Sequence, residues 1–485
     1  MPIRSRRSLL GLAVLCASLQ ALPAVAGRSL EQIRYELYKD PSANVEADLR
    51  PLAERGDLES KRLLADVLSG SGANARLTEA ISLYKEAFAD GRGDVTALAG
   101  LARQAEVNRR VREQNRDYFR QALRQYPQGQ DVRTVSTTLE VSLAYPEFFQ
   151  EAQLEELIAL YERSCLYECY PQIYRAALAE QQGDKARAEA LYIEAMRYDP
   201  RAVNRYYELL GDDRDARFTA FAESQMNNMN DFHPESVQRI GSTLNGMWAE
   251  EEPASEETLE IEGQDMVEDD GRPPVNEEVD ELALMRPKRK ENLNAVAWLD
   301  NAVERGSVSA MIAKVNYMSL HADAYSASSA FELIERVEQS HPAQGKQLRA
   351  AILMNPGWKT LDPEQAQRLA QELIDDGHEQ AWLTMADLYS RGALDEADQD
   401  KALEIYSRMA EGGSPAAYYR MANLYARGRA FCQDKTMAYA YGVVAFELGT
   451  PRARGFLQML EKELDPAEVQ RGKATGEQIL KGMNL

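Results

Sequence analysis

The stretch GSPAAYYRMANLYARG, from Gly413 to Gly428, decides the fold because it holds the start, one face and the end of a helix. Ser414 is a favoured N-cap residue, and Pro415 fits the first position inside a helix. Apolar side chains then recur at i, i+4, i+7 and i+8, which places them on one helical face. They are Ala417, Met421, Leu424 and Tyr425. Gly428 can end the helix in a left-handed conformation, so the stretch predicts an amphipathic helix between two glycine turns.

The same turn recurs along the C-terminal half with the pattern Gly-x-x-x-Ala. Its glycines are Gly306, Gly377, Gly413 and Gly449, and its alanines are Ala310, Ala381, Ala417 and Ala453. Both series step by 71, 36 and 36 residues along the chain. A second amphipathic pattern precedes the quoted stretch, over residues 402 to 409. Each unit is therefore predicted to be a hairpin of two helices that approach closely at the alanines, and such hairpins stack into a superhelix.

The N-terminal half repeats this plan less regularly. GDLES at Gly56 and GDVTA at Gly93 match the turn, and Asp199-Pro200 has the cap and first helical residue of another. Similar helix cores, SLYKEA, ALYERS and ALYIEA, begin at Ser82, Ala159 and Ala190. We therefore predict an all-α fold, a superhelical solenoid of helix-hairpin repeats, in both halves of the chain.

The predicted division of the chain has four parts. They are a signal peptide over 1–26, N-terminal repeats over 27–248, an acidic disordered insertion over 249–292, and C-terminal repeats with a terminal helix over 293–485. The terminal helix begins with the capping-box pattern from Asp465 to Glu468. A final helix is expected there because the last repeat must cover its apolar face.

The N-terminal leader has the three regions of a secretory signal. Three arginines precede the apolar run Leu9–Leu15, and Ala24–Ala26 supplies small residues for cleavage. Such a signal predicts export to the periplasm, by the general or the twin-arginine route. Leu15 stands before Cys16 where a lipidation site needs a small residue, so we do not expect a lipid anchor. Later segments contain no apolar run long enough for a transmembrane helix.

The acidic insertion interrupts the repeats. Between Glu250 and Glu281, 15 of 32 residues are acidic and Arg272 is the one basic residue. Such a segment buries too little apolar surface to fold by itself. A basic cluster follows at residues 286–290. The insertion is interpreted as a solvated connection between two repeat arms, or alternatively as a regulatory segment that pairs with its own basic cluster or a basic partner.

Charge and motifs exclude several classes of function. The chain of 485 residues carries a formal charge of −22, which repels nucleic acid. Its four histidines form no HExxH pair, and no GxSxG elbow or phosphate-binding loop is present. We therefore predict no catalytic residues, no cofactor and no metal site. Cys165 and Cys169 lie four residues apart and form either a disulfide or two thiols, and Cys432 has no assigned role.

Aromatic residues at fixed repeat positions suggest two different roles. Tyr84, Tyr161 and Tyr192 recur at one register, which favours packing between units over a sugar-binding groove. At another repeat position, the residue type changes from one unit to the next. The residues at this position are Trp382, Tyr418 and Arg454. Variation within a repeating frame is typical of recognition surfaces, so these three are the candidate partner-binding residues, although an unconstrained surface would look the same.

The pattern A-x-x-x-[LM]-A-x-L-Y-x-x-G, present from Ala417 to Gly428, resembles a Sel1-like repeat, a subclass of the tetratricopeptide repeats. The resemblance is strong over residues 295–460 and fainter over 45–210. The end of the chain, Lys435–Gly472, and the LDPEQAQRLAQ stretch at Leu361 are similar to AlgK-type scaffolds of bacterial alginate export. That resemblance implies a protein without catalytic residues that supports an outer-membrane porin and docks polymer-modifying enzymes.

The sequence therefore favours a periplasmic repeat scaffold that binds proteins of an exopolysaccharide secretion complex, and associates with the outer membrane through them. The polymer itself is a further candidate partner, while nucleic acid is not. One alternative is a periplasmic adaptor or regulator of a cell-envelope enzyme. Another is a polysaccharide-active enzyme built on an α/α toroid, which would need a cluster of acidic and aromatic residues at one end of its ring.

Overall fold

The computed structural model describes residues 28–39, 43–70, 76–125, 131–164, 169–247, 292–355, 357–358, 361–391, 398–428, 433–450 and 452–483. Within these ranges every regular element is an α-helix or a short 3-10 helix, and none is a strand. This confirms the predicted all-α class. The signal peptide and nearly all of the acidic insertion lie outside the described residues, so their predicted properties stay predictions.

Helices of the N-terminal half run from α1 to α13. They are α1 Leu30–Lys39, α2 Glu46–Glu54, α3 Leu58–Gly70, α4 Leu77–Phe88, η2 Ala89–Gly91, α5 Thr96–Val107, α6 Arg109–Gln125, α7 Val132–Ala144, η3 Pro146–Phe148, α8 Glu151–Ser164, α9 Gln172–Gln181, α10 Lys185–Ala195, α11 Arg201–Leu209, η4 Gly211–Asp213, α12 Arg214–Ser224, η5 Met226–Asp231 and α13 Pro234–Met247.

Helices of the C-terminal half run from α15 to α25. They are α15 Leu293–Glu304, α16 Val308–Leu320, α17 Ala327–Ser340, α18 Pro342–Leu353, α19 Pro363–Asp375, α20 Ala381–Arg391, α21 Gln399–Glu411, α22 Pro415–Arg427, α23 Lys435–Glu447, α24 Arg452–Glu463 and α25 Pro466–Gly482. The quoted stretch is thus helix α22 with its two flanking turns.

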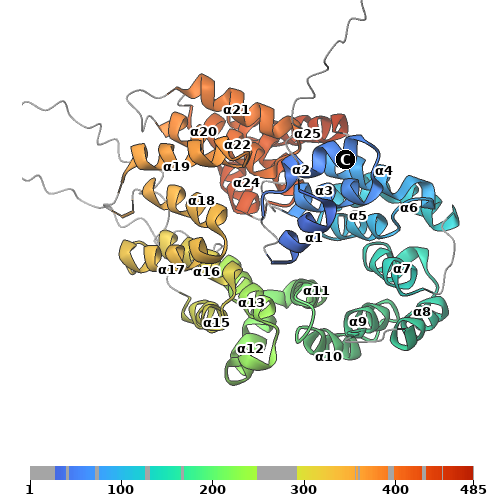
Figure 1. Cartoon of the computed structure of the whole chain (residues 1–485). Coiled ribbons are helices and arrows are strands. Elements are labelled where there is room, and N and C mark those ends of the chain that lie inside the picture. Colours follow the sequence, from blue (N-terminus) through green and yellow to red (C-terminus); the bar gives the residue numbers. More distant parts are fainter. Residues whose placement is uncertain are drawn as a thin grey trace, which may run out of the picture.

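The helices form two rows around a ring (Figure 1). Most helices pack on their neighbours in the chain, and α25 packs on α23. Helices α3, α5, α7 and α9 also contact one another in succession, as do α11 with α13, α13 with α16, and α18 with α20. We call α3, α5, α7, α9, α11, α13, α16, α18, α20 and α22 the inner row. Figure 1 shows α8, α10, α12, α15 and α17 outside it. In the turns at Gly56, Gly306, Gly377 and Gly413, it is the helix after the turn that lies in the inner row.

The predicted glycine turns have one backbone geometry. Gly306, Gly377, Gly413 and Gly449 adopt φ values of 83°, 82°, 83° and 99°. At the turn in the quoted stretch, the Gly413 amide donates to the Ala410 carbonyl at 2.8 Å and the Ser414 amide to the Met409 carbonyl at 3.1 Å. This is a Schellman C-cap, which needs a left-handed residue and therefore favours glycine. The four glycines thus follow four different helices with the same left-handed backbone.

The alanines of the repeat share one environment, and its helix caps are formed by side chains. Ala310, Ala381, Ala417 and Ala453 are fully buried, where only a small side chain lets two helices approach. The side chain of Ser414 accepts a hydrogen bond from the Ala417 amide, which fixes the first turn of α22. At the end of the chain, Asp465 and Glu468 form the predicted reciprocal capping box.

One turn differs from the sequence interpretation. At the turn in GDVTA, Ala89 and Gly91 rather than Gly93 are left-handed, with φ of 44° and 81°. Gly93 serves a different need, because a Cβ there would lie 2.1 Å from the Ala87 carbonyl oxygen. Asn292 is the N-cap of α15, which begins at Leu293, and its side chain accepts from the Ala295 amide.

The two ends of the solenoid meet, which the sequence did not predict. The side-chain amide of Asn44 donates to the Asp376 carbonyl, although 332 residues separate them. Arg76 at the start of α4 forms an ion pair with Glu379 at 2.5 Å. In Figure 1 the blue helices α2 to α5 accordingly lie beside the red helices of the C-terminal end. The solenoid is therefore a closed ring of hairpins.

Candidate functional site

The three predicted partner-binding residues occupy different environments. Trp382 on α20 is half-buried under Arg408, whose guanidinium carbon lies 4.8 Å from the ring centroid. Tyr418 on α22 is only 6% exposed, and its ring lies 6.1 Å from that of Tyr441 on α23. Burial raises the pKa of Tyr418 to about 12. Arg454 on α24 is exposed. Their role in partner binding stays a prediction, and Arg454 presents the most surface for it.

A group of interactions that the sequence interpretation missed connects the inner row to the outer helices. The hydroxyl of Tyr406 on α21 donates to the Asp387 carboxylate on α20 at 2.5 Å. Arg420 on α22 donates to the same carboxylate at 2.7 Å. Burial, together with the negative charge of Asp387, raises the pKa of Tyr406 well above its ordinary value. One carboxylate thus joins three successive helices.

The same kind of group recurs in the N-terminal half. Tyr84 on α4 donates to Asp66 on α3 at 2.7 Å, and Arg103 on α5 lies 4.0 Å from that carboxylate. Burial raises the pKa of Tyr84 strongly, and the Asp66 charge adds to this effect. A third copy uses Tyr192 on α10, which donates to Glu180 on α9 at 2.7 Å. These two tyrosines belong to the register predicted to pack between units, and both are fully buried.

The largest charged cluster of the inner row joins α5, α7, α9 and α11. Arg201 donates to the carboxylates of Glu140 and Asp199, each at 2.7 Å. Tyr174 donates to Glu140 at 2.8 Å, and Arg205 donates to Glu106 at 2.8 Å. Burial alone would lower the pKa of Arg201, but its bonds to Asp199 and Glu140 outweigh burial and raise the pKa. The cluster is therefore fixed in geometry before any partner arrives.

The carboxylates of this cluster are all bound by arginines. A general acid or base would need a proton that it can exchange with a substrate. Among the described residues, no group of three or more His, Cys, Asp or Glu side chains could hold a metal ion. Cys169 is disulfide-bonded, while Cys165 and Cys432 fall outside the described residues.

A basic surface on α6 stands out against the acidic chain. Helix α6 carries six arginines, and Arg116 and Arg120 both lie over the ring of Phe148, with guanidinium carbons 5.5 Å and 5.4 Å from its centroid. Glu147 lies 3.0 Å from Arg116 and partly neutralises it. Stacking holds planar guanidinium groups in one orientation, which suits them to carboxylate ligands.

The helices of the described part of the chain include none that is both long and apolar enough to cross a bilayer. The sequence matches no protein-family model. Comparison with curated proteins likewise finds no matching relative.

Several solved structures are similar to the chain, including the following two. One is a protective antigen of uropathogenic Escherichia coli that displays an SLR fold, with 14% identity, a TM-score of 0.26, and coverage of 91% of this chain and 95% of the antigen. The other is a Sel1 repeat protein from Oxalobacter formigenes, with 16% identity, a TM-score of 0.27, and coverage of 72% and 85%. Scores this low do not establish a shared overall arrangement, so the fold rests on the helices and turns described above.

Proposed function

We propose that this chain is a periplasmic scaffold that binds proteins of an exopolysaccharide secretion complex, namely that of alginate. In this role it supports an outer-membrane porin and docks polymer-modifying enzymes. The proposal rests on the resemblance of Lys435–Gly472 to AlgK-type scaffolds and on the leader sequence. Its structural support is the inner row, because stacked hairpins offer an extended curved surface to a partner.

The observation that carries the binding role is the fixed geometry of the inner-row side chains. In three separate parts of the row, a buried tyrosine hydroxyl from a neighbouring outer helix donates to an inner-row carboxylate and holds it in place. A surface whose side chains are ordered in advance loses less conformational entropy when it binds. The proposed mechanism is therefore geometric, and it involves no covalent chemistry, cofactor or metal.

Because the ring is closed, one alternative function has to be tested. Enzymes of the α/α-toroid class also arrange helix hairpins in a closed ring, and the cluster around Arg201 contains both acidic and aromatic residues. Such an enzyme needs acidic residues that are available to the substrate, whereas Glu140 and Glu106 are bound by arginines. Incubation of the purified chain with alginate, followed by assay for new reducing or unsaturated ends, decides between the two. We expect no product, and any turnover would refute the scaffold proposal.

A capture experiment tests the scaffold itself. The purified chain is immobilised, exposed to envelope extract of the source bacterium, and the bound proteins are identified by mass spectrometry. We expect the porin and the polymer-modifying enzymes of one exopolysaccharide system. Enrichment of a cell-wall enzyme instead would favour the adaptor or regulator alternative.

Two matched arginine variants then locate the surface. Arg103 on the inner row is 45% exposed and lies 4.0 Å from Asp66, while Arg368 on the outer helix α19 is 65% exposed and lies 4.0 Å from Glu364. Arg103→Glu should reduce capture, and Arg368→Glu should leave it unchanged. Equal capture by both variants would show that the inner row is not the binding surface.

A further inference from the structure

The two ends of the solenoid meet along a junction that we call the seam. The part of the seam at the glycine turns is polar. Arg76 pairs with Glu379 at 2.5 Å across the seam and also with Glu46 on its own side. Position Gly412 lies so close to the N-terminal half that an added Cβ would be 3.6 Å from the Arg76 side chain. The turn at Gly377 therefore lies beside the start of α2, and the turn at Gly413 lies beside the start of α4.

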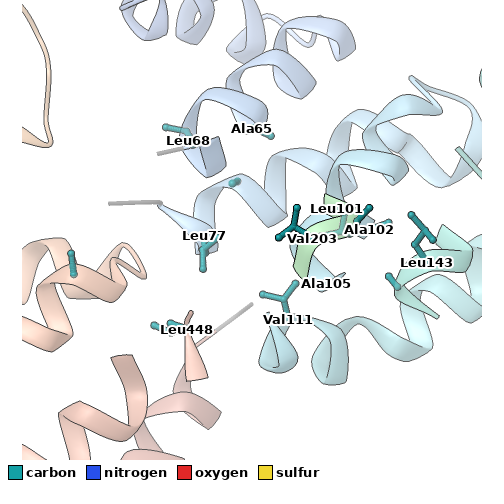
Figure 2. Close-up of a cluster of buried hydrophobic side chains, with 14 of the residues drawn as sticks. Ala65, Leu68, Leu77, Leu101, Ala102, Ala105, Val111, Leu143, Val203 and Leu448 are labelled. Carbon is teal, nitrogen blue, oxygen red and sulfur yellow. The ribbon is translucent and has the colours of Figure 1, made fainter. Parts of the chain in front are cut away.

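An apolar part of the seam lies farther along. Leu448, at the end of α23, belongs to the same buried cluster as Leu77 of α4 and Val111 of α6, and Figure 2 shows the three side chains near one another. All three are nearly or fully buried. Gln114 on α6 also donates to the Leu480 carbonyl on α25 at 3.3 Å. Burial of these apolar side chains favours the closed ring.

The seam is less completely packed than the interior of a hairpin. Helices of one hairpin pack extensively on each other, whereas no helix pair across the seam does so among the described residues. A pocket of about 200 Å³, partly open to solvent, lies along the seam between Asn44 on one side and Lys346, Asp376 and His378 on the other. The Oε2 atom of Glu379 that bonds Arg76 is buried, although the rest of its side chain is partly exposed.

We infer that this seam is a releasable latch, which holds the ring shut and whose opening gives a large partner access to the inner row. Stacked repeats allow such a movement, because small rotations at many hairpin interfaces add up to a wide displacement of the ends. The latch residues are Arg76, Leu77 and Val111 on one side, and Glu379, Gly412 and Leu448 on the other. The inference concerns the geometry of the chain and stands independently of the proposed exopolysaccharide system.

A disulfide across the seam tests whether the closed ring exists in solution. In a Cys432→Ser background, Arg76→Cys and Gly412→Cys place two thiols at positions that contact each other in the closed ring. We expect an intramolecular disulfide in the monomer, seen as a mobility shift on a non-reducing gel and confirmed by peptide mapping. The two single-cysteine variants are the controls. Absence of the intramolecular link in folded protein would overturn the inference.

A second variant tests whether the latch releases. Glu379→Arg together with Leu448→Asp should open the ring, giving a larger radius of gyration in solution scattering while helical circular dichroism is retained. Adding Leu448→Asp to the double-cysteine protein, in which Arg76 is already replaced, should lower the disulfide yield. Glu338→Arg breaks a comparable ion pair with Arg349 between α17 and α18, away from the seam, and should change neither measurement. An unchanged radius and disulfide yield in the latch variant would show that the ring is rigidly closed.

Discussion

At the scale of single residues, the buried tyrosines are the least expected feature of the chain. A register of tyrosines was predicted to pack between units, and Tyr84 and Tyr192 do so. Their hydroxyl bonds to carboxylates were not predictable, because a chain with 78 acidic residues contains many chance pairings of the required spacing. Only the fold brings a particular carboxylate to a particular hydroxyl.

The hydroxyl of Tyr406 provides the first prediction. Tyr406→Phe keeps the buried ring but removes a hydrogen bond to the charged Asp387, so we expect a loss of about 1.5–3 kcal/mol in the free energy of unfolding. Tyr389→Phe, at a half-buried ring under Lys401, is the control and should cost much less. Urea unfolding followed by circular dichroism measures both. Equal losses for the two variants would mean that the Tyr406 bond contributes no net stability.

Unfolding measurements can separate buried from exposed residues within the candidate recognition register. Tyr418→Ala empties a buried site and should cost about 3–5 kcal/mol, the usual loss for a large aromatic side chain in a core. Arg454→Ala removes an exposed side chain and should change stability by less than about 0.5 kcal/mol. Thermal unfolding measures both variants. A partner-binding test is therefore informative with Arg454→Ala, and a large thermal loss in that variant would place Arg454 among the packing residues.

His378 gives the seam a pH dependence with a definite sign. Burial lowers the pKa of His378, with Lys346 acting in the same direction and Asp376 opposing it. The unfolded chain then binds the proton more readily, so stability is complete above about pH 6.5 and falls as the pH drops below that value. His378→Gln should reduce the stability difference between pH 7 and pH 5. The same difference in variant and wild type would show that other groups control the acid response.

At the scale of elements, the Gly-x-x-x-Ala pattern predicted the hairpins because each of its positions has a local physical requirement. The glycine must be left-handed and the alanine must be small, and both properties can be read from the residue type alone. Gly93 shows the limit of such local reasoning. It satisfies the pattern, but Ala89 ends the preceding helix, and the reason that Gly93 must be small is the nearby Ala87 carbonyl.

The backbone role of a left-handed glycine can be tested at a position where an added side chain would meet no neighbour. Gly306 has φ of 83° and open space around the position of a Cβ, so Gly306→Ala should destabilise the chain by about 1–2 kcal/mol through backbone strain. Gly455 lies within α24 and also has open space, so Gly455→Ala should stabilise it by about 0.5–1 kcal/mol. Denaturant unfolding measures both. Changes of the same sign would contradict the assigned backbone roles.

At the scale of the whole molecule, closure of the ring was beyond sequence analysis. Repeat patterns describe contacts between neighbouring units, whereas the seam joins residues more than 300 positions apart. Its members look ordinary in the sequence, since Arg76, Glu379 and Leu448 belong to no shared motif. The curvature that brings them together is the sum of many small rotations between hairpins, which no single motif encodes.

Closure should also change how the chain unfolds, and the positions of the tryptophans allow this to be measured. Three of the four tryptophans, at 298, 358 and 382, lie in the C-terminal repeats, and Trp248 is the last residue of the N-terminal range, so fluorescence reports mainly on the C-terminal half while circular dichroism reports on every helix. In an open solenoid each repeat depends mainly on its neighbours, and the two halves can unfold separately. In the closed ring the seam couples them, so we expect the two signals to give one denaturant midpoint.

The latch variant tests whether the seam makes the two halves unfold together. Glu379→Arg with Leu448→Asp should remove the coupling, so that the fluorescence and circular dichroism midpoints move apart, whereas Glu338→Arg should lower both together. Coincident transitions are the standard test for cooperative unfolding, so the comparison needs no assumption about which half is more stable. Separate midpoints in the wild-type chain would show that the seam does not couple the two halves, even if the ring is closed.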